Sequence, residues 1–188
     1  MPSIQMLDFV NCLLPFASRV VMSPKDILGS TAFYPVKTDI QGNIDKLKKH
    51  FLSNPMLDTL QKLVQVEVDA GTTEKSGSAT DALMWLKRAL HFITEFLGAV
   101  GKGEKDLTAA AKNAYQASLA AHHGFIVRQV FNVAMMAVPS WEGFIKASQA
   151  GSDEDEATIV AQIGSMVGSF EGLLKNADEV YTALGLPN

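Results

Sequence analysis

Hydrophobic residues recur every three to four positions along nearly the whole chain, which is the period of an amphipathic α-helix. No stretch shows the alternation of apolar and polar residues between turn residues that marks a β-strand. The sequence therefore predicts an all-α protein of about eight helices. They are expected at residues 4–21, 36–51, 56–70 and 79–100, at 106–137 with a break near 122–124, at 141–150, and from the acidic turn 152–155 to about 184.

Prolines and glycines mark the boundaries of these segments. Pro15 should kink the first helix, because a proline inside a helix removes one backbone hydrogen bond. The pair Asn54-Pro55 is typical of a break between two helices. Loops are expected at residues 23–35 and 71–78, and the segment 101–103 offers glycines for a left-handed helix end.

Length and composition predict one soluble domain over residues 1–188. The hydrophobic share of 47% is ordinary for a globular protein, and no uninterrupted apolar run reaches the roughly 18 residues of a membrane span. The first residues lack the pattern of a secretion signal, and the single Cys12 agrees with a reducing compartment, so a cytoplasmic protein is expected. The net charge of -4 argues against nucleic acid as a partner.

Asp39, Asn43 and Lys46 carry the first candidate chemistry. Their spacing places the three side chains within about 60° of one helical face. One acceptor, one amide and one cation in a fixed array suit the many hydroxyls of a sugar. The same spacing is also typical of a solvated helix face with an ion pair.

Trp85 lies on one stripe with Phe92 and Phe96 in the helix expected at 79–100, and Arg88 follows one turn later on nearly the same side. A tryptophan beside polar groups can offer its flat face to a sugar ring. Aromatic stripes at this spacing more commonly belong to a protein core, so Trp85 is also a candidate core anchor.

His123 heads an apolar stripe that contains Val127, Val130, Phe131 and Ala134. A histidine in this position could donate a hydrogen bond into a dry pocket, for example to an amide carbonyl. Such a histidine is more often a core residue with a partner in the protein.

No metal, cofactor or catalytic activity is expected. Adjacent histidines cannot both face one ion from a helix, and no other Cys or His spacing supplies ligands. The chain has no nucleophile elbow, P-loop or dinucleotide fingerprint. A helical hydrolase that pairs His123 with Asp39, and a protein-interaction module without a small ligand, are the alternatives from other functional classes.

Three motifs occur in order: Asp39-x-x-x-Asn43-x-x-Lys46, Trp85-Leu86-Lys87-Arg88 and His123-Gly124. Together they resemble the ligand site of the glycolipid transfer protein family. The similarity continues through residues 33–39, 113–115 and 144–147, so it covers most of the chain. It implies a two-layer α-helical fold that encloses an apolar tunnel, transfer of glycosphingolipids between membranes, and transient contact with a membrane surface.

The resemblance also implies roles for single residues. Asp39, Asn43 and Lys46 would bond the sugar hydroxyls, and Trp85 would stack beneath the first sugar. Asp39 would also accept from the ceramide amide N–H, while His123 would donate to the ceramide carbonyl. The expected tunnel lining is Phe33, Leu86, Phe92, Phe96, Val127, Phe131 and Ala134.

A related branch of this family transfers ceramide phosphate and has a lysine where this chain has Asn43. Asn43 and Trp85 therefore favour a sugar headgroup. Binding or sensing of ceramide phosphate or of another sphingolipid on the same fold is the alternative.

Phe125 stands where the family's best-known member has tryptophan, so another residue should help the protein to contact a membrane. Trp141 follows Pro139 at a predicted corner between helices and is expected to enter the membrane interface with Phe125. The alternative is that Trp141 packs on the short helix that contains Phe144.

Overall fold

The computed structural model describes residues 34–149 and 151–187, with side chains from residue 38 onward. These residues form α-helices and one short 3-10 helix, without a strand among them, which confirms the predicted all-α class. The helix expected at residues 4–21 and the side chain of Phe33 lie outside the described residues. The elements are α2 (Tyr34–Ser53), α3 (Leu60–Asp69), α4 (Ala79–Gly101), α5 (Leu107–Ser118), η2 (Ala120–His122), α6 (Phe125–Met135), α7 (Trp141–Gln149) and α8 (Glu156–Ala183).

Short polar side chains set the start of three helices close to where the sequence predicts them. Such a side chain accepts a hydrogen bond from a backbone N–H that has no partner inside the helix. Ser78 caps α4, Asp106 caps α5 and Asp155 caps α8 in this way. The break predicted near 122–124 is also confirmed, because η2 ends at His122 and α6 begins at Phe125.

Two helix starts differ from the prediction. α2 begins at Tyr34, so Pro35 lies inside its first turn, where a missing N–H costs nothing. α3 begins at Leu60 and not near Met56, because Thr59 caps it by accepting a hydrogen bond from the N–H of Lys62 at 3.2 Å. Residues 54–58 form the preceding turn.

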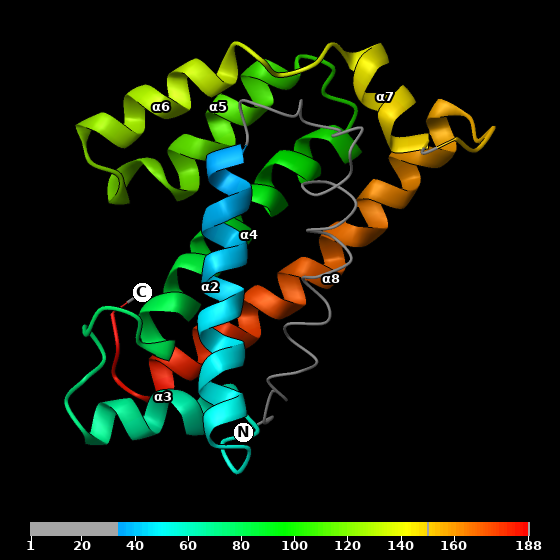
Figure 1. The fold of residues 1–188 in the computed structure, drawn as a ribbon. Helices are drawn as coiled ribbons and strands as arrows, with labels where there is room; N and C mark the ends of the chain where they lie inside the picture. Colours follow the sequence, from blue (N-terminus) through cyan, green and yellow to red (C-terminus); the bar gives the residue numbers. More distant parts are fainter. Residues whose placement is uncertain (1–33, 150, 188) are drawn as a thin grey trace.

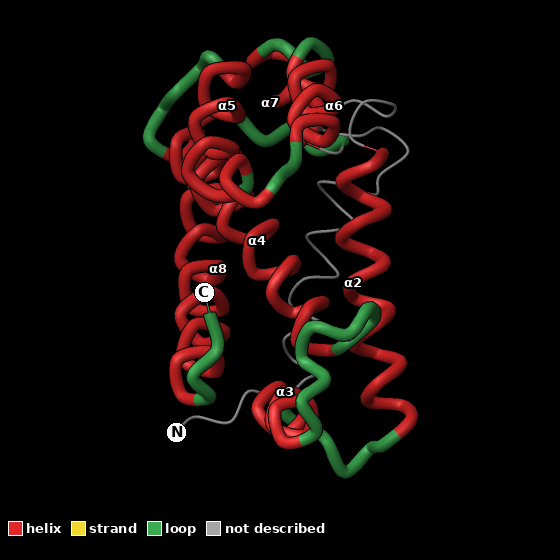
Figure 2. The backbone as a smooth tube through the Cα atoms, turned by 90° about the vertical axis from the view of Figure 1, so that its left-hand side faces the viewer, coloured by secondary structure: helices red, strands yellow, loops and turns green. Residues whose placement is uncertain are grey.

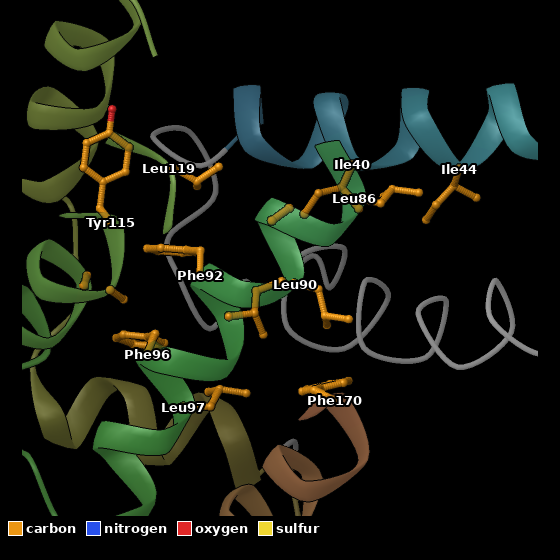
Figure 3. Packing of buried hydrophobic residues seen from close by; sticks show 14 of the residues in the cluster. Ile40, Ile44, Leu86, Leu90, Phe92, Phe96, Leu97, Tyr115, Leu119 and Phe170 are labelled. Carbon is orange, nitrogen blue, oxygen red and sulfur yellow. The ribbon is translucent and has the colours of Figure 1, made fainter. Parts of the chain in front are cut away.

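α4 is the central helix of the described structure. It packs against α2, α3, α5 and α8. Figures 1 and 2 show α4 crossing between α2 on one side and α8 on the other, with α3 near one end of the molecule and α5, α6 and α7 at the opposite end. Ile40 and Ile44 of α2 face α4 near Leu86 in the buried core (Figure 3).

α8 is the one described helix that is long and apolar enough to cross a membrane, judged by length and composition alone. A core helix of a soluble protein passes the same test, but such a helix is mostly buried, whereas 17% of the apolar window of α8 is buried. In this structure the end of α8 is attached to α4, because the hydroxyl of Tyr181 donates a hydrogen bond to the carbonyl of Thr80 at 2.5 Å.

α4 and α8 approach each other closely at two glycines. A Cβ atom added to Gly101 would lie 3.2 Å from the Cα of Gly164, whereas a Cβ atom added to Gly164 would meet nothing within 4 Å. The absence of a side chain at Gly101 therefore sets the distance between the two helices at this crossing.

We expect Gly101→Ala to lower the melting temperature, because the backbone of α8 must shift to accept the new methyl group. Overpacking of this kind costs roughly 1–3 kcal/mol, which corresponds to several degrees in a domain of this size. Gly164→Ala is the matched control and should be neutral or stabilising by up to about 1 kcal/mol through helix propensity. Equal melting temperatures for the two variants, measured by circular dichroism, would contradict the close crossing.

Candidate functional site

The polar trio of α2 lies on one face of the helix, but its members differ in exposure. Asn43 is buried, Lys46 is half-buried and Asp39 is exposed. The ammonium group of Lys46 donates a hydrogen bond to Oδ1 of Asn43 at 2.9 Å. The i, i+4, i+7 spacing therefore builds a connected polar group that opens to solvent at Asp39.

Trp85 of α4 is half-buried. The guanidinium group of Arg88, one turn later, lies over the Trp85 ring at 5.1 Å from its centroid. Nε of Arg88 is buried and has no hydrogen-bond partner among the described residues. The indole is thus neither a fully buried core anchor nor a free surface ring.

His123 connects these helices to α5 and α6. Its ring stacks on Trp85 with centroids 5.8 Å apart and an interplanar angle of 22°. Nδ1 of His123 lies 3.0 Å from the hydroxyl oxygen of Tyr115. Arg128 also contacts the backbone of His123, because Nε of Arg128 donates a hydrogen bond to the His123 carbonyl at 2.8 Å.

Charge couples the α2 face to His123. Burial raises the pKa of Asp39 although the residue is exposed overall, while Lys46 and His123 oppose this rise. Burial lowers the pKa of His123, and Asp39 opposes that change. The two side chains therefore lie close enough to influence each other, and at neutral pH His123 is mainly uncharged.

The structure thus brings Asp39, Trp85 and His123 together from three separate segments of the chain. The group offers a carboxylate acceptor, a flat aromatic face and a neutral imidazole that can donate from one ring nitrogen. No group of three or more His, Cys, Asp or Glu side chains within the described residues is arranged to hold a metal ion.

A continuous set of aromatic rings leads from His123 into the core. The Tyr115 ring stacks on Phe131 at 3.6 Å, Phe131 meets Phe92 edge-on at 5.8 Å, and Phe92 stacks on Phe96 at 6.4 Å. Figure 3 places Tyr115, Phe92 and Phe96 in the same packed region. Five of the expected lining residues are buried: Leu86, Phe92, Phe96, Phe131 and Ala134. Val127 is the one expected lining residue with a described side chain that is not buried.

Val127 is 46% exposed, whereas Phe131, one turn later, is 6% exposed. The apolar stripe predicted below His123 therefore divides, because the helix turns Val127 and Val130 toward solvent and Phe131 toward α4 and α5. Val127 can take part in a ligand site only at its edge.

The expectation that Trp141 occupies an exposed corner is wrong. Trp141 is buried, and its ring stacks on Phe144 at 6.2 Å. Lys105 covers it at 5.1 Å from the ring centroid. Phe125, the second residue of that expectation, is 77% exposed.

Tyr115 is the residue of this site that sequence reasoning missed. It lies eight residues before His123 and on the other side of a helix break, so no helical spacing connects the two. Only the packing of α5 against α6 brings the phenol to the imidazole.

Comparison with known families gives a match over most of the chain. A family model described as glycolipid transfer protein matches residues 6–150. Pleckstrin homology domain-containing family A member 8 from Homo sapiens is 41% identical over 167 residues, and the protein of that name from Mus musculus is 48% identical. These alignments cover 86% of this chain but 32% of each relative, so the chain spans about a third of their length.

Solved structures share the fold. A structure described as showing how FAPP2 selects simple glycosphingolipids using the GLTP-fold has a TM-score of 0.83 and 36% identity, and the match covers 99% of this chain and 89% of that chain. HET-C2, a fungal glycolipid transfer protein, gives 0.79 and 27%, with coverage of 96% and 86%. Human ceramide-1-phosphate transfer protein gives 0.82 at 20% identity, with coverage of 99% and 90%, and shows similarity of fold alone.

The ionised carboxylate of Asp39 should lower the free energy of unfolding at neutral pH. Burial raises its pKa above the ordinary 3.8, so between these two values the unfolded chain binds fewer protons than the folded chain. The resulting penalty is present above the folded pKa and disappears as the pH falls below about 3.8. We expect Asp39→Asn to melt slightly above the parent at pH 7, with a small difference because the carboxylate is exposed.

Melting curves recorded over a pH series test this expectation. Asp45→Asn is the control, because Asp45 is an exposed carboxylate of the same helix and accepts a hydrogen bond from Gln41 at 2.8 Å. A variant Asp39→Asn that melts below the parent at pH 7 would mean that the carboxylate stabilises the fold.

Proposed function

This chain belongs to the glycolipid transfer protein family, whose model matches residues 6–150, and on this premise we propose that it binds a glycosphingolipid and carries it between membranes. One observation carries the proposal: Asp39, Trp85 and His123 meet beside the outer end of a buried series of aromatic rings. A lipid with a polar headgroup and apolar chains needs a polar site directly beside an apolar region, and the structure has both at this point. The description of FAPP2 as selecting simple glycosphingolipids supports the same ligand class.

The polar groups suit the headgroup of such a lipid. In the proposed complex Asp39, Asn43 and Lys46 exchange hydrogen bonds with the sugar hydroxyls, and the sugar ring stacks on Trp85. Asp39 also accepts from the amide N–H of the ceramide, and His123 donates to its carbonyl. The ring of His123 and the guanidinium of Arg88 both lie against the Trp85 ring in this structure. One of these two groups must therefore move away when a sugar stacks on the indole.

The apolar chains of the lipid would follow the aromatic residues inward. Tyr115, Phe131, Phe92 and Phe96 form a continuous path that begins next to His123. Leu86 and Ala134 are buried in the same core cluster. A hydrocarbon chain between these side chains would exchange the bilayer for an equally apolar environment.

Energetics explain why such a lipid needs a carrier. Exposing a chain of about 15 carbons to water costs on the order of 12 kcal/mol, at ~0.8 kcal/mol per CH₂ group. Unaided transfer between membranes is therefore slow. A protein that only shields the chains during transfer removes most of this cost without a chemical step, so we propose a carrier and not an enzyme.

The buried amide of Asn43 favours a neutral headgroup. It accepts the hydrogen bond of Lys46, which directs the one cation of the α2 trio toward a neutral partner. A lysine at this position would add a second positive charge and suit a phosphate. Ceramide phosphate is the alternative ligand, and mass spectrometry of lipids taken from mixed vesicles distinguishes the two.

The exposed face of α6 is the proposed contact with the membrane. Large apolar side chains cover this face and the helix end: Phe125, Ile126, Val127, Val130, Val133 and Met136. Several large apolar side chains exposed on one short helix are typical of an interaction site, and the position of α6 next to His123 suits entry of a lipid.

Asp39→Val tests the proposed function. We expect the variant to remain folded but to transfer glucosylceramide between phosphatidylcholine vesicles at least roughly 10-fold more slowly, because the ligand loses hydrogen bonds to a charged acceptor. Asp45→Val makes the same change on the exposed face of the same helix and should transfer at the rate of the parent. A parent protein that transfers no glycosphingolipid would overturn the proposal.

Replacing Ile126 and Val133 together with Gln tests the docking face. Both side chains are strongly exposed, so their loss should not affect folding, but the affinity for phosphatidylcholine vesicles should fall roughly tenfold or more. Leu52→Gln is the control, since Leu52 is 74% exposed at the end of α2 that is remote from α6 (Figure 1). Vesicle sedimentation that gives equal binding for all these proteins would exclude α6 as the contact.

A further inference from the structure

The phenol of Tyr115 has a defined place in the packing. Its residue is 4% exposed, and its ring stacks on Phe131 at an interplanar angle of 11°. Its hydroxyl oxygen lies 3.0 Å from Nδ1 of His123, which is a hydrogen-bond distance. Stacking on Phe131 fixes the phenol ring, and the ring in turn directs its hydroxyl at the imidazole of His123.

The direction of this hydrogen bond follows from the burial of the phenol. If Nδ1 carried the proton and donated to the phenol, the hydroxyl proton of Tyr115 would need another acceptor in a buried position. The described residues provide no other hydrogen bond for it. Leaving a buried donor without a partner is unfavourable, whereas an imidazole nitrogen is a good acceptor. Tyr115 therefore donates to Nδ1.

We propose that Tyr115 is a positioning residue that holds His123 in the tautomer with its proton on Nε2, so that the site selects lipids with an N-acyl carbonyl. This inference rests on the proposed function. A neutral imidazole has only one proton, so a hydrogen bond at Nδ1 determines what Nε2 can do. With Nδ1 occupied as an acceptor, Nε2 is the donor that a ceramide carbonyl requires.

The surroundings of His123 keep its ring neutral. Burial lowers its pKa; Asp39 of α2 raises it, and His122 of η2, Arg128 of α6 and Arg88 of α4 lower it further. Tyr115 of α5 faces the same ring. Since the imidazole is mainly uncharged at pH 7, its tautomer is a property that a neighbour can control.

Tyr115→Phe tests the proposal, because it removes the hydroxyl and keeps the ring that stacks on Phe131. We expect the affinity for glucosylceramide in phosphatidylcholine vesicles to fall about threefold to tenfold at pH 7, as for the loss of one hydrogen bond. Nitrogen-15 NMR of the parent imidazole should show a protonated Nε2 and an unprotonated Nδ1, and the variant should show a mixture. A parent with its proton on Nδ1 would overturn the proposal.

The pH dependence separates positioning from packing. Below the pKa of His123 both ring nitrogens carry protons, so Nε2 donates in the parent and in Tyr115→Phe alike. The difference in glucosylceramide affinity between the two proteins should therefore shrink as the pH falls. The ratio of the two affinities is the quantity to compare, because the titration of Asp39 affects both proteins alike and cancels in the ratio. A ratio that stays constant over the titration would assign Tyr115 a purely structural role.

A double-mutant cycle with His123→Ala completes the test. If Tyr115 acts through His123, then Tyr115→Phe should change the affinity by less than about twofold in the His123→Ala background. A full loss in that background would overturn the proposal. A parent that binds no glucosylceramide would instead overturn the proposed function, while normal binding with no effect of Tyr115→Phe would overturn this inference alone.

Discussion

The site depends on how the start of α4 is fixed, and a buried carboxylate fixes it. Glu67 of α3 accepts hydrogen bonds from the backbone N–H groups of Ala79 and Thr80 at 2.7 and 2.8 Å, and from the Thr80 hydroxyl at 2.6 Å. An anion at this position also meets the positive end of the helix dipole. Tyr181 of α8 bonds the carbonyl of Thr80. The first turn of α4 is therefore held from two sides, and its rotation about its own axis is determined.

That rotation decides which side chains of α4 reach the site. Lys87 is bound on the α8 side, where its ammonium group meets Asp178 at 2.9 Å and lies over the Tyr181 ring. Trp85 and Arg88 then extend on a different side of the helix, where the indole meets His123. Because a helix is rigid over these few residues, a contact made for stability near Glu67 also places the aromatic face of the candidate site.

The sequence predicts those features that local physical chemistry determines. Ser78, Asp106 and Asp155 precede apolar periodic runs, and each caps a helix close to the predicted position. The exposure of Trp141 could not be predicted, because Pro139 indicates a corner but not the direction of the next side chain, which the ring of Phe144 sets. The same holds for Tyr115 and His123, whose hydrogen bond exists only through the packing of α5 and α6. Local sequence signals therefore predict where helices begin and end, whereas the contacts between side chains of different helices depend on tertiary packing.

A carrier must also release what it binds, and the polar groups of the site suit this requirement. Lys46 is already bonded to Asn43 before any ligand is present. In the proposed function a headgroup therefore exchanges hydrogen bonds at the α2 trio and does not gain all of them anew, so the net free energy per bond stays small. The apolar chains likewise exchange one apolar environment for another. In the proposed function neither part of the lipid gains a large free energy in the protein. Small differences among headgroups at Asp39, Trp85 and His123 would then decide which lipid is carried, and release into the next membrane would remain fast.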